Sequence, residues 1–422
     1  MWLIGLIILI IGLIISVALH ELGHLVPAKK FGTMVPEYWV GFGPTLWQTK
    51  RGSTTYGIKA VLLGGYVRIV GMFPGGPENR KRQRADGRLT LVEEARQQSM
   101  QDVEEARAAG GTGVPFYELS TPRKVAVMSG GPLMNLAISF VLIAVVLLGF
   151  GYEVPTTTIE QVAGPVNGVE SPAAEAGLRA GDTLVAWDGV PVEDWEQLRE
   201  LISSSPASGA TATVERDGEL MTFEVVPVIN DDGSASIGIT SLLGREPAAV
   251  GDVFSTTWQL FTGTGKAIIG LPVSVFNLGK SMFTGEERDS EGVISIVGVA
   301  RIAGEITSPS SFTSEQTTST GTLTQSVSFA DRMLLMLSLL ASLNMALFVF
   351  NLIPLPPLDG GHIMGALWGG ARNASAKLRG KPKPPPADTA RMVPLTYAVF
   401  GALMVLTLIL ILADIFKPLS LA

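Results

Sequence analysis

The sequence predicts a polytopic α-helical membrane protein with four transmembrane helices and one β-rich domain outside the membrane. Hydrophobic residues make up 47% of its 422 residues and charged residues only 16%, against about 25% charged residues in an average globular protein. Four apolar runs are long enough to cross a bilayer, because about 18 residues at a rise of 1.5 Å span roughly 27 Å. None of the runs alternates polar and apolar residues as a barrel strand does. They are residues 2–19, 125–150, 333–358 and 393–415.

The charge balance and the cysteine count exclude several classes of protein. The chain carries 31 Lys and Arg against 38 Asp and Glu, a net charge of −7, whereas binding of nucleic-acid phosphates needs a basic surface. The absence of Cys excludes disulfide scaffolds, iron–sulfur clusters, thiolate zinc sites and cysteine nucleophiles. Any histidine chemistry must use the three histidines of the chain, which are His20, His24 and His362.

Basic residues predict how the spans are oriented. Residues 26–124 contain fifteen Lys and Arg and residues 371–392 contain six, whereas the longer segment 152–330 contains only eight. The positive-inside rule therefore places the first two segments in the cytoplasm and both chain termini outside, although Arg332 disagrees. The alternative interpretation of the first run is a cleaved signal peptide, but that run lacks a basic segment before it and an A-x-A cleavage site.

The segments between the spans differ in character. Residues 155–228 hold strand-like runs and one amphipathic helix, and residues 307–330 form a Ser/Thr-rich linker. A charged surface helix is expected at 88–109, after a basic run at 80–84 that we interpret as a solvated anchor near anionic lipid. The expected segments are the first transmembrane helix (1–25), a β-element (26–73), a charged cytoplasmic insertion (74–124), the second transmembrane helix (125–150), the outer domain (155–245), outer membrane-surface helices and a linker (246–330), the third transmembrane helix (333–370), a basic loop (371–392) and the fourth transmembrane helix (393–416).

The motif His20-Glu21-Leu22-Gly23-His24 at the end of the first span predicts a metal site. Histidines four residues apart lie on one face of a helix, so both imidazoles can reach one metal ion. The intervening Glu21 is near enough to take a proton from a water on that metal. The alternative is that the two histidines only cap a helix, but ionisable groups at the end of an apolar span are costly and rarely retained without a use.

A catalytic zinc site needs a third protein ligand as well as an open position for water. Candidates lie in residues 351–362, where three prolines break the third apolar run. Irregular backbone at that depth survives only in a protein-lined or wet cavity, which places Asp359 as the third ligand. On residue chemistry alone His362 competes with it, because imidazole binds zinc as readily; the other role open to His362 is to hold the aspartate by a hydrogen bond.

These residues resemble the site-2 protease family of intramembrane zinc metalloproteases, and within it the bacterial regulator-of-sigma protease branch. The shared elements are H-E-x-x-H in the first span, G-P-x-x-N at residues 131–135 in the second, and N-x-x-P-x-P-x-L-D-G at residues 351–360 in the third. Their order, the number of spans and the orientation fit that branch over most of the chain. The insertion at about 74–115 matches poorly, and the resemblance leaves its role open.

The resemblance implies a zinc site and a mechanism. In the family the aspartate of L-D-G completes the metal site, which makes His20, His24 and Asp359 the expected ligands of Zn²⁺. Zinc lowers the pKa of its water towards about 7 and polarises the scissile carbonyl, while Glu21 takes the water proton and passes it to the leaving amide nitrogen. Asn351 is expected to hydrogen-bond to the developing oxyanion or to substrate backbone.

The resemblance also implies the fold between the spans. The glycine-punctuated, strand-prone residues 41–72 correspond to a β-element that dips into the membrane, where its edge can pair with an unwound substrate segment; an ordinary cytoplasmic hairpin is the alternative. The motif at residues 171–189 resembles that of a bacterial PDZ domain, which we expect at about 155–245. Such a domain would gate access or sense a trimmed substrate end rather than act as a rigid spacer. The expected fold is a polytopic α-helical membrane protein with four transmembrane helices, a membrane-associated β-element and one extracytoplasmic PDZ domain.

The function that this resemblance implies is regulated intramembrane proteolysis by a multi-pass protein of the cell inner (plasma) membrane, with its active site towards the cytoplasm. An outer protease first trims a single-span membrane protein, expected to be an anti-sigma factor, and this chain then cuts the membrane-embedded remainder. Two other classes stay open. A non-catalytic PDZ-bearing membrane scaffold with a structural metal would not need Glu21, and a metal transporter would place ionisable residues across its spans, of which the second and fourth have almost none.

Overall fold

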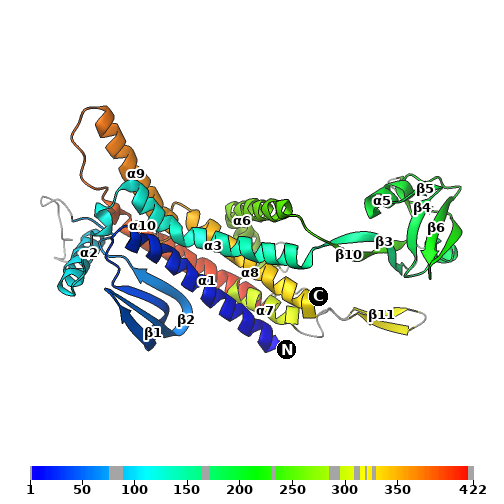
Figure 1. Ribbon diagram of the computed structural model, residues 1–422, viewed down its shortest axis with the longest axis horizontal. Coiled ribbons are helices and arrows are strands. Elements are labelled where there is room, and N and C mark those ends of the chain that lie inside the picture. Colours follow the sequence, from blue (N-terminus) through cyan, green and yellow to red (C-terminus); the bar gives the residue numbers. More distant parts are fainter. Residues whose placement is uncertain are drawn as a thin grey trace. The chain divides into compact units, whose positions relative to one another are not determined.

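The structure is a computed structural model of the chain and describes residues 2–75, 89–163, 171–230, 233–284, 295–307, 314–318, 321–325 and 329–416. Two compact units are distinguished. One consists of residues 1–146 and 251–422, and the other of residues 147–250. The first unit is mainly helical and contains the motifs of the expected metal site, whereas the second is rich in β-strands (Figure 1).

Four helices of the first unit are long and apolar enough to cross a membrane, which confirms the four predicted spans. At most 33% of the apolar stretch of each is buried inside the protein, so much of the remaining apolar surface is free to contact lipid. The first helix continues well beyond the predicted run and therefore carries the whole H-E-x-x-H motif. The four helices are α1 (Trp2–Lys30), α3 (Thr121–Phe150), α8 (Phe329–Leu352) and α10 (Val393–Phe416).

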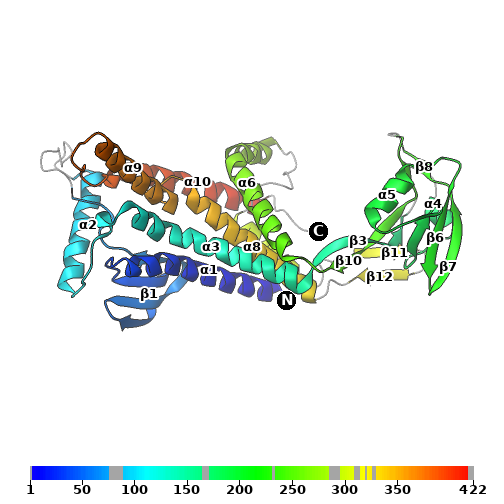
Figure 2. The same cartoon turned by 45° about the horizontal axis from the view of Figure 1, so that its top comes forward.

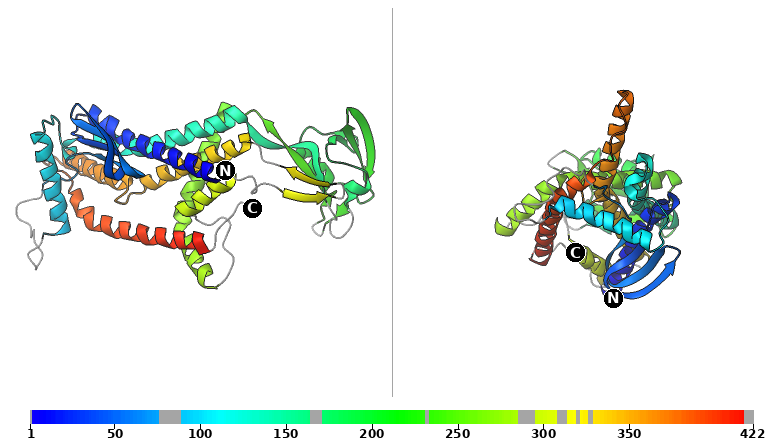
Figure 3. Two further views of the ribbon diagram at one scale, coloured as in Figure 1. Left: turned by 90° about the horizontal axis from the view of Figure 1, so that it is seen from below. Right: turned by 90° about the vertical axis from the view of Figure 1, so that its left-hand side faces the viewer.

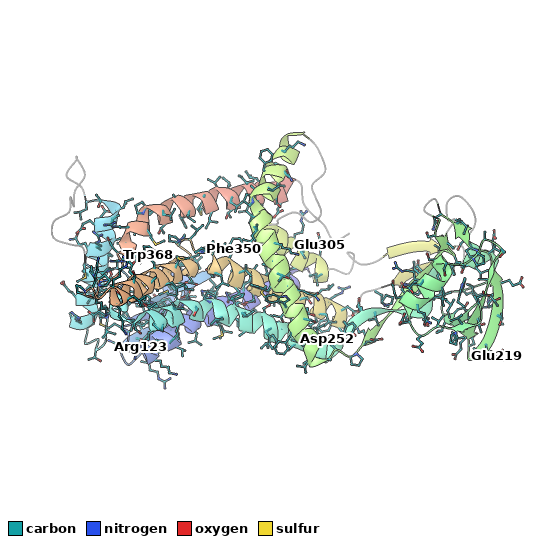
Figure 4. All side chains as sticks on the ribbon, turned by 90° about the horizontal axis from the view of Figure 1, so that it is seen from above. Arg123, Glu219, Asp252, Glu305, Phe350 and Trp368 are labelled. Carbon is teal, nitrogen blue, oxygen red and sulfur yellow. The ribbon has the colours of Figure 1, made fainter. Side chains whose placement is uncertain are left out.

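The segment expected as the third transmembrane helix, residues 333–370, is interrupted. Helix α8 ends at Leu352, and a new helix, α9 (Asp359–Leu378), begins after residues 353–358. The prolines in this break have no amide hydrogen to donate and cannot continue a helical ladder. Figure 4 labels Phe350 on α8 and Trp368 on α9, so the break can be followed between them. Its consequence is that Asp359 occupies the first turn of a helix rather than the middle of one.

Strands β1 (Glu37–Arg51) and β2 (Thr54–Arg68) form the β-element that follows α1. Residues 37–40 pair with residues 65–68 on one side and with residues 55–58 on the other. The strands are fixed to α1 at the metal-site motif, because the Tyr38 hydroxyl donates to the Ala18 carbonyl oxygen at 2.7 Å. Figure 2 shows the element lying along α1.

Helix α2 (Leu91–Ala108) confirms the charged helix predicted at 88–109, while the basic run at 80–84 lies outside the described residues. Its N-cap Thr90 accepts a hydrogen bond from the Glu93 amide, which is why the helix begins there. The short 3₁₀ helices η1 (Phe116–Glu118) and η2 (Thr389–Met392) precede α3 and α10.

Two further helices of the first unit are α6 (Val250–Thr284) and α7 (Ile296–Thr307). Helix α6 runs across α3 and α8 (Figure 3) and contacts them through the ring pairs Phe254–Phe140 and Phe261–Phe348. The sequence predicts a linker at 307–330, but strands β11 (Ser314–Thr318) and β12 (Gly321–Gln325) pair within it. Threonine is a strand-forming residue, so a Thr-rich segment can pair as well as serve as a linker.

The second unit is built on a sheet in the order β10–β3–β4–β6–β7, with the short β5 paired to β4. Trp187, Leu184 and Leu198 are fully buried between this sheet and helix α5. Strands β3, β4, β6 and β7 and helix α5 fall where the sequence predicts strand-like runs and an amphipathic helix within residues 155–228, whereas strands β9 and β10 lie beyond those runs. Its elements are β3 (Tyr152–Val162), α4 (Pro172–Glu175), β4 (Thr183–Trp187), β5 (Val190–Pro191), α5 (Trp195–Ser203), β6 (Ala210–Arg216), β7 (Glu219–Val225), β8 (Val228–Ile229), β9 (Ala235–Ser236) and β10 (Ile239–Glu246).

Candidate metal centre

The two histidines of the motif lie on one face of α1, as their spacing predicts. Their Nε2 atoms are 3.3 Å apart. The two rings meet edge to face, with an interplanar angle of 80°, so both Nε2 atoms point into the same space. His24 is buried, with 5% of its surface exposed, which leaves this nitrogen little access to solvent.

Asp359 completes the group from α9. Its Oδ2 atom lies 3.4 Å from the Nε2 atom of His20 and 3.4 Å from that of His24. This oxygen is buried and has no hydrogen-bond partner among the described residues. Among those residues, His20, His24 and Asp359 are the group of potential metal ligands whose donor atoms lie within 4.8 Å of one another.

The three donor atoms fit a zinc ion. Around a tetrahedral zinc ion with nitrogen and oxygen ligands at 2.0–2.2 Å, neighbouring ligand atoms are about 3.3 to 3.5 Å apart. The three separations in the cluster, 3.3, 3.4 and 3.4 Å, match this edge length. Three protein ligands also leave a fourth position open, as a catalytic zinc site requires.

The outer nitrogens of both imidazoles are held by α3. His24 Nδ1 lies 2.8 Å from the Val127 carbonyl oxygen, so that nitrogen carries the hydrogen and donates. His20 Nδ1 lies 3.0 Å from the side-chain amide of Asn135, whose two ends exchange by a 180° rotation, so Asn135 can accept from Nδ1. Both contacts direct Nε2 towards Asp359, as outer partners of metal-binding histidines do.

Glycines allow α1 and α3 to approach closely enough for these contacts. A Cβ on Gly23 would lie 2.3 Å from the Gly130 carbonyl oxygen, and a Cβ on Gly130 would lie 2.0 Å from that of Gly23. A Cβ on Gly131 would lie 2.2 Å from His24 Nε2 itself. The G-P-x-x-N motif thus supplies both an open space at the cluster and, through Asn135, a partner for His20.

Glu21 lies between the histidines and the β-element. A Cβ on Gly65 would be 3.3 Å from Glu21 Cγ, and the backbone amide of Val67 is near enough to interact with the Glu21 carboxylate. The strand segment 65–68 therefore runs beside this carboxylate.

The remaining candidates of the sequence lie outside the cluster. His362 is one turn along α9 from Asp359 and does not belong to the group of donor atoms, so the geometry favours Asp359. Asn351 is half-buried in the last turn of α8, and its side chain makes no hydrogen bond among the described residues. Asn344, seven residues before Asn351 on α8, is fully buried and donates to Ser16 Oγ of α1 at 3.0 Å, so its side chain joins two helices.

Comparison with known proteins agrees with this geometry. The sequence matches peptidase family M50 over residues 8–382. The chain belongs to peptidase family M50. It is 32% identical over 461 residues to the zinc metalloprotease Rip1 of Mycobacterium tuberculosis, covering 100% of this chain and 99% of the relative. It is 26% identical over 462 residues to the zinc metalloprotease RasP of Shouchella clausii, covering 96% and 97%.

This M50 protein is a zinc metalloprotease of the site-2 protease type, which confirms the family resemblance and the zinc cofactor. Sequence reasoning missed the two contacts that orient the imidazoles. The partner of His24 is a backbone carbonyl and carries no side-chain signal. The partner of His20, Asn135, did carry a sequence signal. It is four residues from Gly131, so both lie on the same face of a helix.

Proposed function

We propose that this M50 protease cleaves the transmembrane segments of single-span membrane proteins at a zinc ion held by His20, His24 and Asp359. The observation that carries the proposal is the triangle of donor atoms with sides of 3.3, 3.4 and 3.4 Å, which joins one end of α1 to the break after α8. Helix α1 is apolar enough to span a membrane, and so is α8, which ends directly before the break, so the peptide bonds within reach are those of a segment at membrane depth.

Glu21 is the residue that moves the proton. Zinc, when bound, supplies a Lewis acid that activates a water and polarises the scissile carbonyl. The carboxylate of Glu21 lies on the same helix between the two ligands, accepts the water proton and returns it to the leaving nitrogen. Asn351 remains our candidate for a hydrogen bond to the substrate backbone, since its side-chain amide is not engaged by the described residues.

Strand pairing presents the substrate. In a helix every amide is already hydrogen-bonded, so a transmembrane helix must unwind before it is cut. Residues 65–68 pair with residues 37–40 on one side only, and their other side faces Glu21. An extended substrate segment that pairs with this edge would place its peptide bonds beside the carboxylate.

The position in the cell follows from the distribution of charge. We infer that the protease lies in the cell inner membrane, with the metal centre towards the cytoplasm and the unit 147–250 outside. That unit is proposed to be a PDZ domain that gates access to the centre or senses a trimmed substrate end. Anti-sigma factors already cut by an outer protease are the proposed substrates, because cleavage on the cytoplasmic side would release a cytoplasmic fragment.

The proposal is tested with Glu21→Gln in the full-length protein. The variant should keep zinc and lose cleavage of a membrane-embedded single-span reporter, whereas Glu94→Gln, at an exposed position on α2, should cleave it as the wild type does. Comparing membrane proteomes of cells with wild type and Glu21→Gln should then reveal accumulated stubs, which identify the substrates. Undiminished cleavage by Glu21→Gln would reject the mechanism, whereas zinc binding without any cleavage by the wild type would favour the scaffold with a structural metal.

A further inference from the structure

A cavity of about 410 Å³ lies next to the metal centre and is not used by the mechanism above. Its walls are the residues that follow β2, one face of α2, the proline break with the first turn of α9, and the start of α10. His362 and Gly361 line it, so it begins within one helical turn of Asp359.

Helix α2 belongs to the insertion that the family resemblance leaves unexplained, and it supplies one complete wall of this cavity. The residues that it contributes are spaced by three and four positions, so they form a single helical face. They are Ala95, Gln98, Ser99 and Asp102. Figure 2 shows α2 at the end of the helices where the β-element also lies.

Ion pairs hold this wall in place from two sides. Arg96, with 4% of its surface exposed, pairs with Asp388 in front of α10 and with Glu93 of its own helix. On the other side, Arg68 at the end of β2 pairs with Asp102. Helix α2 is thereby tied both to the strand that runs beside Glu21 and to the segment that precedes α10.

The polar groups of the wall are engaged with one another rather than offered to a ligand. Ser99 Oγ donates to the Phe73 carbonyl oxygen at 2.9 Å and accepts from the Phe73 amide at 3.0 Å. Asp102 accepts from Arg68 and from Gln98. What the cavity presents is therefore largely apolar, and its apolar lining includes Ile69, Met72, Phe73, Met392 and Val393.

The cavity continues the strand edge at which we place the substrate. Gly65 lies beside Glu21, and Ile69, four residues further along the chain, already lines the cavity. At about 3.3 Å per residue, four residues of strand cover roughly 13 Å. A substrate strand paired with residues 65–68 would therefore reach the cavity about four residues from the bond beside Glu21.

We propose that this cavity is a specificity pocket, which receives a large apolar side chain of the substrate about four residues from the scissile bond, on the side towards α2. The inference rests on the proposed function, since it needs a substrate strand on the 65–68 edge. It assigns to the insertion a role in choosing the cleavage site rather than in the chemistry.

The test fills the pocket and leaves the metal centre untouched. Single-span reporters carry Ala or Phe at each position from two to six residues on either side of the cleaved bond, and kcat/KM and zinc content are measured for each full-length enzyme. At one position wild type should prefer Phe by about tenfold, as a hydrophobic pocket does for added apolar groups. Ala95→Phe should abolish that preference and keep the rate for the Ala reporter within about twofold. Gln97→Phe, at an exposed position on α2 outside the pocket, should keep the preference.

A second variant guards against misfolding of the first. Met392→Ala enlarges the same pocket and should shift the preference towards Trp. The specificity pocket is rejected, and the proposed function kept, by either of two results. One is Glu21-dependent cleavage by the wild type with no preference for Phe; the other is a preference that both pocket variants leave unchanged. Absence of Glu21-dependent cleavage of every reporter by the wild type overturns the proposed function with it.

Discussion

Gly131 on α3 faces the imidazole of His24 on α1 so closely that a single methyl group would occupy the metal centre. The Cβ of any other residue at position 131 would lie 2.2 Å from His24 Nε2 and 2.8 Å from His20 Cε1. Both distances are shorter than van der Waals contact, so the imidazoles of His24 and His20 could not keep their positions beside such a side chain. The glycine is therefore part of the site although it has no side chain.

Gly131→Ala should weaken zinc binding by more than the roughly 10- to 100-fold that loss of an outer contact causes, because it displaces a ligand atom directly. Zinc affinity measured by competition with a chelator in detergent-solubilised protein checks this. Gly149→Ala is the matched control, since a Cβ at that position of the same helix meets no atom within 4 Å. Equal affinities of the two variants would show that the cluster does not hold the metal.

Exchange of the third ligand separates Asp359 from His362, between which residue chemistry alone did not decide. Asp359→Asn removes the negative oxygen that lies 3.4 Å from both Nε2 atoms, so the variant should lose stoichiometric zinc and activity together. His362→Asn should retain zinc, because His362 lies outside the group of donor atoms. Metal content by elemental analysis measures both. If the zinc content fell in His362→Asn and not in Asp359→Asn, the assignment would be reversed.

Asn135 should act on zinc through His20. Asn135→Ala removes the partner 3.0 Å from His20 Nδ1, and zinc affinity should fall by about 10- to 100-fold. Asn344→Ala serves as control, because it also deletes a buried amide, one that bonds Ser16 and the Leu340 carbonyl oxygen but no ligand. It should lower thermal stability and leave zinc affinity unchanged. If Asn135→Ala and Asn344→Ala lost zinc affinity to the same extent, Asn135 would have only a packing role.

Features that depend on neighbouring residues in the sequence were predictable. A helix must be apolar over about 20 residues to cross lipid, so composition alone locates all four spans. The motif around His20 and His24 is likewise local, since one helical turn brings both to the same face. In the second unit, the amphipathic helix α5 begins directly after its N-cap Asp194, whose carboxylate accepts from the Gln197 amide. This capping signal lies in adjacent residues of the sequence.

Contacts between distant segments were not predictable in the same way. Arg96 and Asp388 are 292 positions apart, and nothing in either local sequence distinguishes this pair from surface charges. The family motif, not the spacing of residues, favoured Asp359 over His362, and the folded backbone after the prolines supports that choice. The place of α2 in the cavity could not be predicted for the same reason, because the cavity forms only where α2 meets three segments that are distant from it in the sequence.

Acid should weaken the second unit through one buried carboxylate. Asp182 is 1% exposed and accepts from Arg216 Nε at 2.7 Å and from the Arg179 amide at 2.8 Å. Burial by itself raises the pKa of the Asp182 carboxyl, but these hydrogen bonds outweigh it and hold the pKa below its usual range. The carboxylate therefore stabilises the fold above the pKa of the unfolded chain, about 3.9, and this contribution disappears as the pH falls through the lower pKa of the folded state.

Hydrogen exchange of β4 and β6 in the full-length protein, corrected for intrinsic rates, should accordingly show protection that declines as the pH is lowered from about 5. Asp182→Asn should cost about 1–3 kcal/mol at neutral pH, because it replaces a charged acceptor at buried hydrogen bonds, and its protection should depend less on pH. Asp217→Asn, at an exposed position next to Arg216, should behave as the wild type. If the protection of Asp182→Asn declined with pH as steeply as that of the wild type, the acid sensitivity would have to come from another group.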